Sequence, residues 1–163
     1  MIPDQLAKHI ANGTIAWGQA ERLAVAQLLK RYALEDSIWL GLQIDASRDG
    51  AATAVILLDA VRNKMKSPAG APILLVRFPA VASISLWDYE KSERIRRRVA
   101  RAQTRSVSDG LSKTAISDHR GGHIFIVHKE PVRVLCFTAQ GKRTRLNARP
   151  KARSRDAGAH ILS

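Results

Sequence analysis

The chain has 163 residues, 45% of them hydrophobic and 5% aromatic, and a formal net charge of +13 from 27 Lys and Arg against 14 Asp and Glu. This length and apolar content exclude a wholly disordered chain and predict one domain with tails, since a chain of this size buries about two thirds of its unfolded surface. The clustered positive charge predicts a polyanionic partner, nucleic acid first and an anionic membrane surface second. The low aromatic content argues against a base-stacking platform for single strands.

Cys136 is the single cysteine, so no intramolecular disulfide and no cysteine-rich zinc site can form. It lies in an apolar strand pattern, which favours a buried structural thiol over a nucleophile. No run of about 20 apolar residues occurs, and the first residues are unlike a signal peptide. We therefore expect a cytoplasmic protein without a transmembrane segment.

Residues 1–36 are expected to form a pair of helices that pack on the core. Pro3 suits the first turn of a short helix that runs to Ile10, and Asn12-Gly13 ends it. Residues 14–32 predict a longer helix, because apolar side chains recur along one face of it. Those side chains are Trp17, Ala20, Ala24 and Leu28.

Residues 37–139 are expected to form an α/β domain, a mixed sheet with packed helices. The predicted elements are a strand at 38–44, a helix at 52–66, a strand at 72–78, a strand at 81–88 and a basic helix from about Tyr89 to about 105. The segment 118–123 is a turn with two glycines, and 124–127 with 132–138 predict a hairpin around Pro131. Residues 140–163 read as a flexible basic tail.

The predicted basic helix contains the densest charge of the chain. Arg94, Arg97, Arg98 and Arg101 stand at positions i, i+3, i+4 and i+7, so they would share one helical stripe. Such a stripe repels itself unless an anion lies on it, which favours phosphate binding over a solvated face.

Residues 38–103 resemble the ParB/sulfiredoxin superfamily. Residues 72–77, Pro-Ile-Leu-Leu-Val-Arg, are similar to the P-I-x-V-R strand of that family. Residues 92–97, Ser-Glu-Arg-Ile-Arg-Arg, are similar to its G-E-R-R-x-x-A phosphate-binding box, with Ser92 in place of the glycine and Ile95 in place of the second arginine. In size the chain is most similar to the small plasmid-borne members that inhibit conjugative transfer.

The resemblance implies a ParB/sulfiredoxin-like fold and a nucleotide bound at the box, with Mg²⁺ and ATP or another nucleoside triphosphate as cofactors. It implies phosphate contacts from Ser92 and Arg94, joined by the arginines that follow the box, Arg97, Arg98 and Arg101. Glu93, with Asp88 and Glu90 beside it, would hold a metal ion or orient a water for catalysis. The identity of the metal stays open.

Three further groups of residues are candidates for function. Arg120, Gly121 and Gly122 form a second candidate phosphate site, because glycines let backbone amides approach a phosphate and His119 beside them could act as a base; the alternative is an ordinary hairpin turn. Asp45 and Asp49 follow one strand and would converge with the carboxylates after the other strand if the two strands were neighbours. The tail offers Lys142, Arg143, Arg145 and Arg149 to nucleic acid.

Two functions remain open from the sequence. The first is a plasmid- or mobile-element-encoded protein that binds DNA without sequence preference and acts as a DNase or NTPase to interfere with DNA transfer. The second is a non-catalytic basic protein that blocks a DNA-transfer or nucleoprotein partner; the missing box glycine favours it, and the carboxylates beside arginines favour the enzyme.

Overall fold

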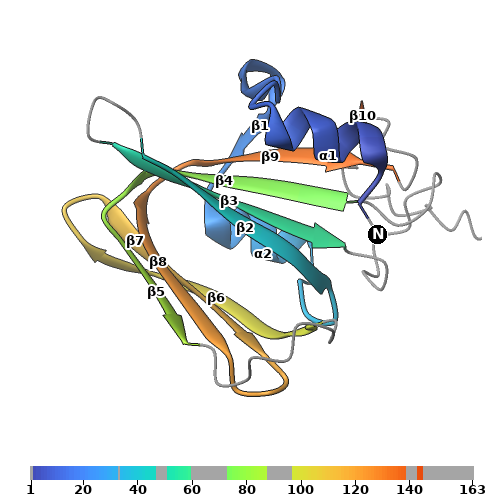
Figure 1. Cartoon of the computed structure of the whole chain (residues 1–163). Helices are drawn as coiled ribbons and strands as arrows, with labels where there is room; N and C mark the ends of the chain where they lie inside the picture. Colours follow the sequence, from blue (N-terminus) through green and yellow to red (C-terminus); the bar gives the residue numbers. More distant parts are fainter. Residues whose placement is uncertain are drawn as a thin grey trace, which may run out of the picture.

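Ten strands and two short α-helices make up the part of the chain that the structure describes, which is residues 2–32, 34–46, 51–59, 73–87, 97–138 and 143–144 of a computed structural model. Two antiparallel sheets face each other, and the helices lie on and between them (Figure 1). The helices are α1 (Asp4–Ala11) and α2 (Val25–Arg31), and η1 (Trp17–Gln19) is a single 3₁₀ turn. The strands are β1 (Glu21–Leu23), β2 (Ile38–Ala46), β3 (Ala52–Asp59), β4 (Ile73–Val81), β5 (Ser83–Trp87), β6 (Val99–Ser108), β7 (Leu111–Asp118), β8 (His123–Lys129), β9 (Val132–Phe137) and β10 (Arg143–Thr144).

Sheet A has the order β1-β9-β4-β3-β2, with β10 also paired to β9, and sheet B has the order β5-β8-β7-β6. Two pairs of consecutive strands pass from one sheet to the other. β4 leads into β5 across Ala82, whose amide donates to the carbonyl of Val127, and β8 leads into β9 across Glu130 and Pro131. β4 pairs with β9 in sheet A and β5 pairs with β8 in sheet B, so one long bent ribbon is shared by both sheets.

The opposite edges of the two sheets also meet. The amide of Val99 donates to Ser37 O and the amide of Asp36 donates to Val99 O, and Ile38 forms an isolated antiparallel bridge with Arg98. The start of β6 is therefore tied to the start of β2. Sheets A and B are joined by the bent ribbon and again by this contact, which leaves a core between them.

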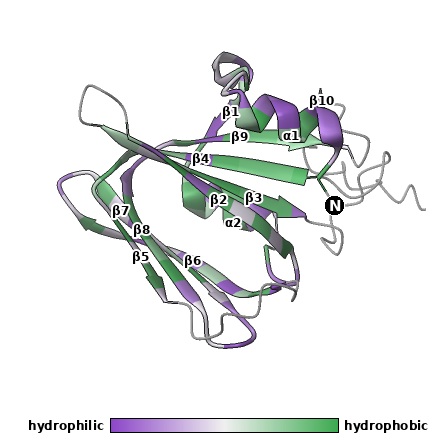
Figure 2. Cartoon of the chain, in the orientation of Figure 1, coloured by the Kyte–Doolittle hydropathy of each residue, from purple (hydrophilic) through white to green (hydrophobic). Residues whose placement is uncertain are grey.

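The core between the sheets is apolar. The inner faces of β3, β4 and β9 pack against the inner faces of β6, β7 and β8, and α2 fills the space beside them with Val25, Leu28 and Tyr32. β4 is coloured as hydrophobic along most of its length in Figure 2. Glu130 lies in the bend between β8 and β9, and its carboxylate accepts a hydrogen bond from the amide of Val25. It therefore places a negative charge at the first turn of α2.

A second, smaller cluster lies on the outer face of sheet A, where α1 covers β4 and β9. Leu6 of α1 is buried there against Leu75 and Leu135. β3 therefore has packed side chains on both faces, because Val55 and Leu57 belong to this outer cluster and Ile56 and Leu58 to the inner core. None of the described helices is long and apolar enough to cross a membrane.

The expected α/β fold with a ParB/sulfiredoxin-like mixed sheet and packed helices is wrong, since the described chain is mostly antiparallel β-structure. The predicted helix at 52–66 is wrong over its described part, which is β3. A strand that is covered on both faces reads as an unbroken apolar run, and such a run has no alternation to distinguish it from a buried helix.

The basic helix is wrong where it is described, because Val99–Ser108 is a strand. Asp109 and Gly110, both with positive φ, form a two-residue turn into β7, and this Asp-Gly pair is the usual signal of a tight hairpin. The expected N-terminal helix pair reduces to α1 and the short α2, with β1 between them. The strands predicted at 124–127 and 132–138 are present as β8 and β9, but they do not pair with each other, so the predicted hairpin is wrong.

Leu74 offers a direct test of the core, because its side chain points inward from β4 and is 0% exposed. Leu74→Ala is expected to lower the free energy of unfolding by about 2–5 kcal/mol, since it leaves a cavity between the sheets. Val107→Ala, at a position that is 51% exposed, is the control and should change that free energy by less than about 0.5 kcal/mol. Urea unfolding followed by circular dichroism measures both, and equal effects would contradict the fold.

Candidate nucleic-acid interface

The outer face of sheet B gathers side chains from four strands that are far apart in the sequence. The strand register places them in three rows across β6, β7, β8 and β5. The rows are Arg101–Ser117–His123–Trp87, Gln103–Ala115–Phe125–Ser85 and Arg105–Lys113–Val127–Ser83. We refer to these twelve residues as the sheet B face.

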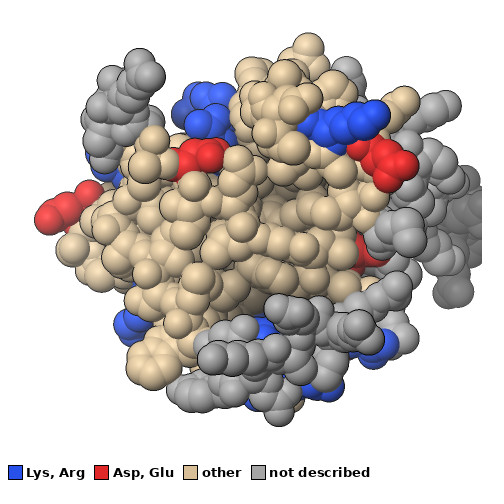
Figure 3. Space-filling view, viewed as in Figure 1, with Lys and Arg blue, Asp and Glu red and all other residues tan. Residues whose placement is uncertain are grey.

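The sheet B face is positively charged. Arg101, Arg105 and Lys113 belong to it, and none of its twelve residues is acidic. Arg105 and Lys113 are direct cross-strand partners, and like charges in that position repel each other. In Figure 3 the lower edge of the molecule, where sheet B lies, shows blue Lys and Arg and no red Asp or Glu among its described residues.

Aromatic rings stand among these cations. The ammonium of Lys113 lies 4.5 Å from the ring centroid of Phe125, a cation–π contact. The ring of His123 is stacked beside that of Phe125, with centroids 5.9 Å apart and an interplanar angle of 12°. Trp87, the cross-strand partner of His123, is 54% exposed. His123 and Trp87 are exposed, whereas Phe125 is half-buried. Exposed rings beside cations can stack on bases while the cations contact phosphates.

The turn between β7 and β8 lies at one end of this face and contains the predicted site Arg120, Gly121 and Gly122. Its backbone amides already have an acceptor, because Oδ1 of Asp118 accepts from the amides of Arg120 and Gly122, each at 2.8 Å. Oδ2 of Asp118 lies 3.5 Å from Nη1 of Arg97. A phosphate at these amides would have to displace the carboxylate of Asp118.

The other predicted site residues divide into two groups. Of the arginine stripe, Arg97, Arg98 and Arg101 lie before or on β6 and not on a helix, and only Arg101 belongs to the sheet B face. Most of the others lie outside the described residues, as does the side chain of Arg143, whose backbone forms β10 beside β9. These residues are Asp49, Asp88, Glu90, Ser92, Glu93, Arg94, Lys142, Arg145 and Arg149.

Asp45 is described and lies on β2, at the edge of sheet A, where its Oδ1 accepts from Gln43 at 3.0 Å. His119 lies 3.7 Å from Asp36, on the exposed surface. Within the described ranges, no three His, Cys, Asp or Glu side chains come together in a group that could hold a metal ion. The residues that the family resemblance assigns to Mg²⁺ and nucleotide lie outside these ranges, so those assignments stay predictions.

Cys136 is buried, as the sequence predicts. Its Sγ lies 3.4 Å from the hydroxyl of Tyr32, which α2 brings into the core. Burial raises the pKa of the Cys136 thiol above its ordinary value of 9.0, and burial likewise raises the pKa of Tyr32. A thiol that stays protonated and inaccessible is a structural group and a poor nucleophile.

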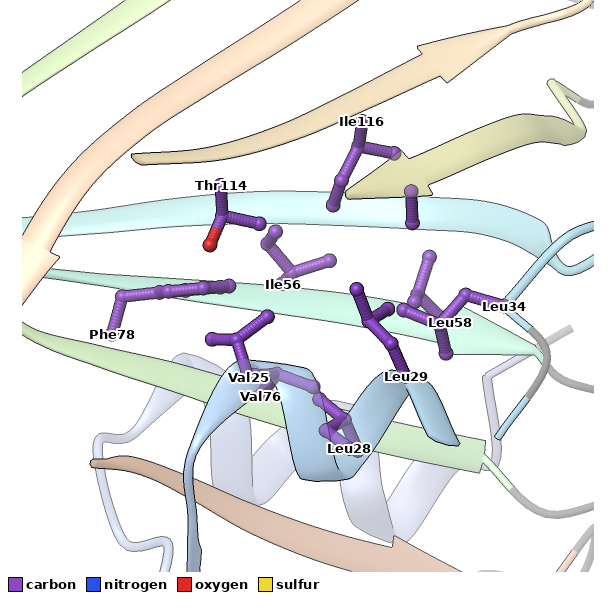
Figure 4. Close-up of a pocket in the computed structure, with 11 residues that line it drawn as sticks. Val25, Leu28, Leu29, Leu34, Ile56, Leu58, Val76, Phe78, Thr114 and Ile116 are labelled. Carbon is purple, nitrogen blue, oxygen red and sulfur yellow. The ribbon is translucent and has the colours of Figure 1, made fainter. Parts of the chain in front are cut away.

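The interior between the sheets is packed and offers no ligand cavity at the position shown in Figure 4. There Leu29 of α2 points toward Ile116, and Val25, Leu28 and Phe78 line the same gap. The hydroxyl of Thr114 is the one polar side-chain atom among the lining residues. The gap has room for at most one water molecule. Contact with a partner must therefore use the outer surfaces of this part of the molecule.

Sequence reasoning did not identify Lys113, Phe125, His123 and Trp87 as parts of one candidate site. Two signals point to them. Arg101, Gln103 and Arg105 alternate with Ala102 and Thr104, which is the period of a strand, and Asp109-Gly110 predicts that β6 and β7 form a hairpin. The register of β8 and β5 against that hairpin is set by tertiary contacts.

No protein-family model, no curated protein and no solved structure matches this chain.

Gly122→Ala tests the role of Asp118 in the turn. A Cβ at position 122 would lie 2.5 Å from Oδ2 of Asp118, so the carboxylate would have to leave the amides and Arg97. We expect a loss of about 1–3 kcal/mol in the free energy of unfolding. Gly18→Ala is the matched control, since a Cβ there meets nothing within 4 Å; equal losses for the two variants in urea unfolding would refute this role.

The buried Tyr32–Cys136 pair predicts a loss of stability at alkaline pH. Both groups have raised pKa values when folded, while the unfolded chain ionises the thiol near 9.0 and the phenol near 10.0. The contribution of these two groups to the free energy of unfolding should therefore be constant below pH 9 and fall as the pH rises above 9. Urea unfolding at pH 8, 9.5 and 10.5 measures the decline. Tyr32→Phe should fall less steeply above pH 10 than the parent chain, and an identical slope would exclude the contribution of Tyr32.

Proposed function

We propose that this protein binds single-stranded nucleic acid, in the first place DNA, on the sheet B face. The observation that carries the proposal is the Lys113–Phe125–His123 cluster, in which an ammonium and two stacked rings share the outer face of sheet B, with Phe125 half-buried and His123 exposed. Arg101 and Arg105 extend the positive charge along β6. Bases would stack on the exposed rings while these cations hold the phosphates.

The arrangement of the cations supports a chain-like ligand. Arg101 and Arg105 are four residues apart on one strand, hence about 13 Å, and Lys113 lies one strand away from Arg105, about 5 Å. Three cations with this spacing can contact several phosphates of one backbone. They are too far apart for all three to contact a single small anion. The net charge of +13 adds a sequence-independent attraction.

The exposed rings favour a single strand over a duplex. Aromatic side chains can stack only on bases that are free of their neighbours, and each stacked base contributes about 1–3 kcal/mol to affinity. The aromatic content of 5% argued against such a platform in the sequence. The sheet changes this argument, since two strands bring Trp87, His123 and Phe125 onto one face.

Binding without catalysis is the simplest form of the proposal. The alternative of a non-catalytic basic protein that blocks a DNA-transfer or nucleoprotein partner stays a prediction. The DNase and NTPase activities, with Asp88, Glu90 and Glu93 as catalytic residues, stay predictions of the sequence. The interference with DNA transfer and the cytoplasmic location stay predictions as well.

Fluorescence anisotropy with a labelled single-stranded DNA of mixed sequence tests the proposal. If three to four phosphates are contacted, the logarithm of the binding constant should fall with the logarithm of salt concentration with a slope of about −2 to −3. Phe125→Ala and Trp87→Ala should each weaken binding by about tenfold, and Lys113→Ala should weaken binding and make the slope shallower by about 0.7. Lys8→Ala, an exposed cation on α1, is the control and should leave affinity unchanged.

A duplex of the same sequence and the RNA strand of the same sequence complete the experiment. The single strand should bind tighter than the duplex, because the duplex hides its base faces. The proposal fails if the duplex binds as well as the single strand, or if the three sheet B variants bind like the parent while removal of residues 145–163 abolishes binding.

A further inference from the structure

Three arginines form a second positively charged feature, on the outer face of sheet A. Arg22 of β1 is the cross-strand partner of Arg133 of β9, and Arg133 is the partner of Arg77 of β4. Cross-strand partners lie on the same face of a sheet, so the three side chains project from that face next to one another. We call these three residues the arginine row. The row belongs to the other sheet from the cluster of Lys113 and Phe125, so it is a separate site.

Trp17 orients two of these arginines. Nη1 of Arg133 donates to the carbonyl oxygen of Trp17 at 3.2 Å, and the guanidinium carbon of Arg77 lies 5.6 Å from the centroid of the Trp17 ring. Trp17 itself is half-buried and belongs to η1, where its carbonyl oxygen also accepts a hydrogen bond from the amide of Ala20. Arg77 and Arg133 are half-buried too, while Arg22 is exposed. Two guanidinium groups are thus fixed in position before any ligand arrives.

The row is electrostatically unbalanced. Neighbouring strands are about 4.8 Å apart, and like charges directly opposite each other destabilise a sheet. No carboxylate of the described residues forms an ion pair with Arg22, Arg77 or Arg133. Asp45 lies beyond β3 on this sheet and is hydrogen-bonded by Gln43 instead. An anion that bridged the row would relieve the repulsion and satisfy the free guanidinium donors.

We propose that the arginine row binds a tetrahedral oxyanion, phosphate or a phosphomonoester. Guanidinium groups donate in a planar fork that matches the paired oxygens of a phosphate, and charge-assisted bonds of this kind are about twice as strong as neutral ones. Three positive charges within about 10 Å suit a dianion better than a single carboxylate. The row spans only three neighbouring strands, so it suits one phosphate group.

Titration with inorganic phosphate tests this site, with chloride adjusted to hold ionic strength constant. Phosphate at ten times its dissociation constant should raise the thermal midpoint of the full chain by roughly 3–6 °C. Arg77→Gln and Arg133→Gln should each weaken phosphate binding at least about tenfold, measured by isothermal titration calorimetry. Arg105→Gln, on the sheet B face, should bind phosphate like the parent chain.

Arg22→Gln keeps the test valid if the half-buried variants fail to fold, because Arg22 is exposed and its substitution disturbs no packing. It should weaken phosphate binding several-fold. The inference is wrong if the parent chain does not bind phosphate, or if Arg105→Gln loses as much affinity as Arg22→Gln. Neither result bears on the proposed binding of single strands, because that proposal is tested with variants of other residues, on the sheet B face.

A pair of oligonucleotides identifies the source of the phosphate. A 5′-phosphorylated strand should bind tighter than the same strand with a 5′-hydroxyl if the row takes the end of a nucleic acid, and Arg22→Gln should remove that difference. Equal binding of the two strands, together with binding of inorganic phosphate, assigns the row to a free phosphate or a small phosphomonoester.

Discussion

The bent antiparallel ribbon formed by β4–β5 and β8–β9 is the constraint on which the rest of the structure depends. Its register runs from Ile73 paired with Phe137 in sheet A to Trp87 paired with His123 in sheet B, and the amide of Ala82 donates to Val127 at the bend. Because the ribbon crosses from one sheet to the other, the side chains that face inward on both halves enclose one core. The side chains that face outward then form two separate surfaces.

These two surfaces differ in how they use arginine and lysine. On sheet B the cations are spread along β6 and β7 and stand beside exposed rings, which suits an extended polyanion. On sheet A, Arg77 and Arg133 are held by one tryptophan and lie next to each other, which suits a single compact anion. Close packing of α1 and η1 against sheet A creates this difference, because it supplies the carbonyl and the ring of Trp17 that fix the guanidinium groups.

Two buried polar side chains of the core, His128 and Thr114, are satisfied by hydrogen bonds within sheet B, whereas the buried Oγ of Ser37 has no hydrogen-bond partner among the described residues. His128 is 0% exposed, and its ring lies edge-on to Phe78 with centroids 4.8 Å apart. Its Nε2 is 2.8 Å from the hydroxyl of Thr114 and its Nδ1 is 2.8 Å from the carbonyl of Lys129. Since that carbonyl can only accept, Nδ1 carries a proton and donates to it, while Nε2 and the hydroxyl of Thr114 form the second hydrogen bond. This chain of bonds connects β7 to the bend at Glu130 and stabilises the passage between the sheets.

Local pattern alone determined several strands, the burial of Cys136 and the positive charge. Branched apolar runs at 73–78 and 132–137 indicate strands wherever they pair, and Cys136 is buried because its neighbours are apolar. Tertiary structure decided the rest. β3 looks like a helix in the sequence, since packing on both faces removes the alternation, and the arginines of 94–101 fit a helical period although β6 pairs with β7. Of the predicted site residues that the structure describes, only Arg101 belongs to the sheet B face. Register across four strands, which no local pattern specifies, brings Lys113, Phe125, His123 and Trp87 to that face.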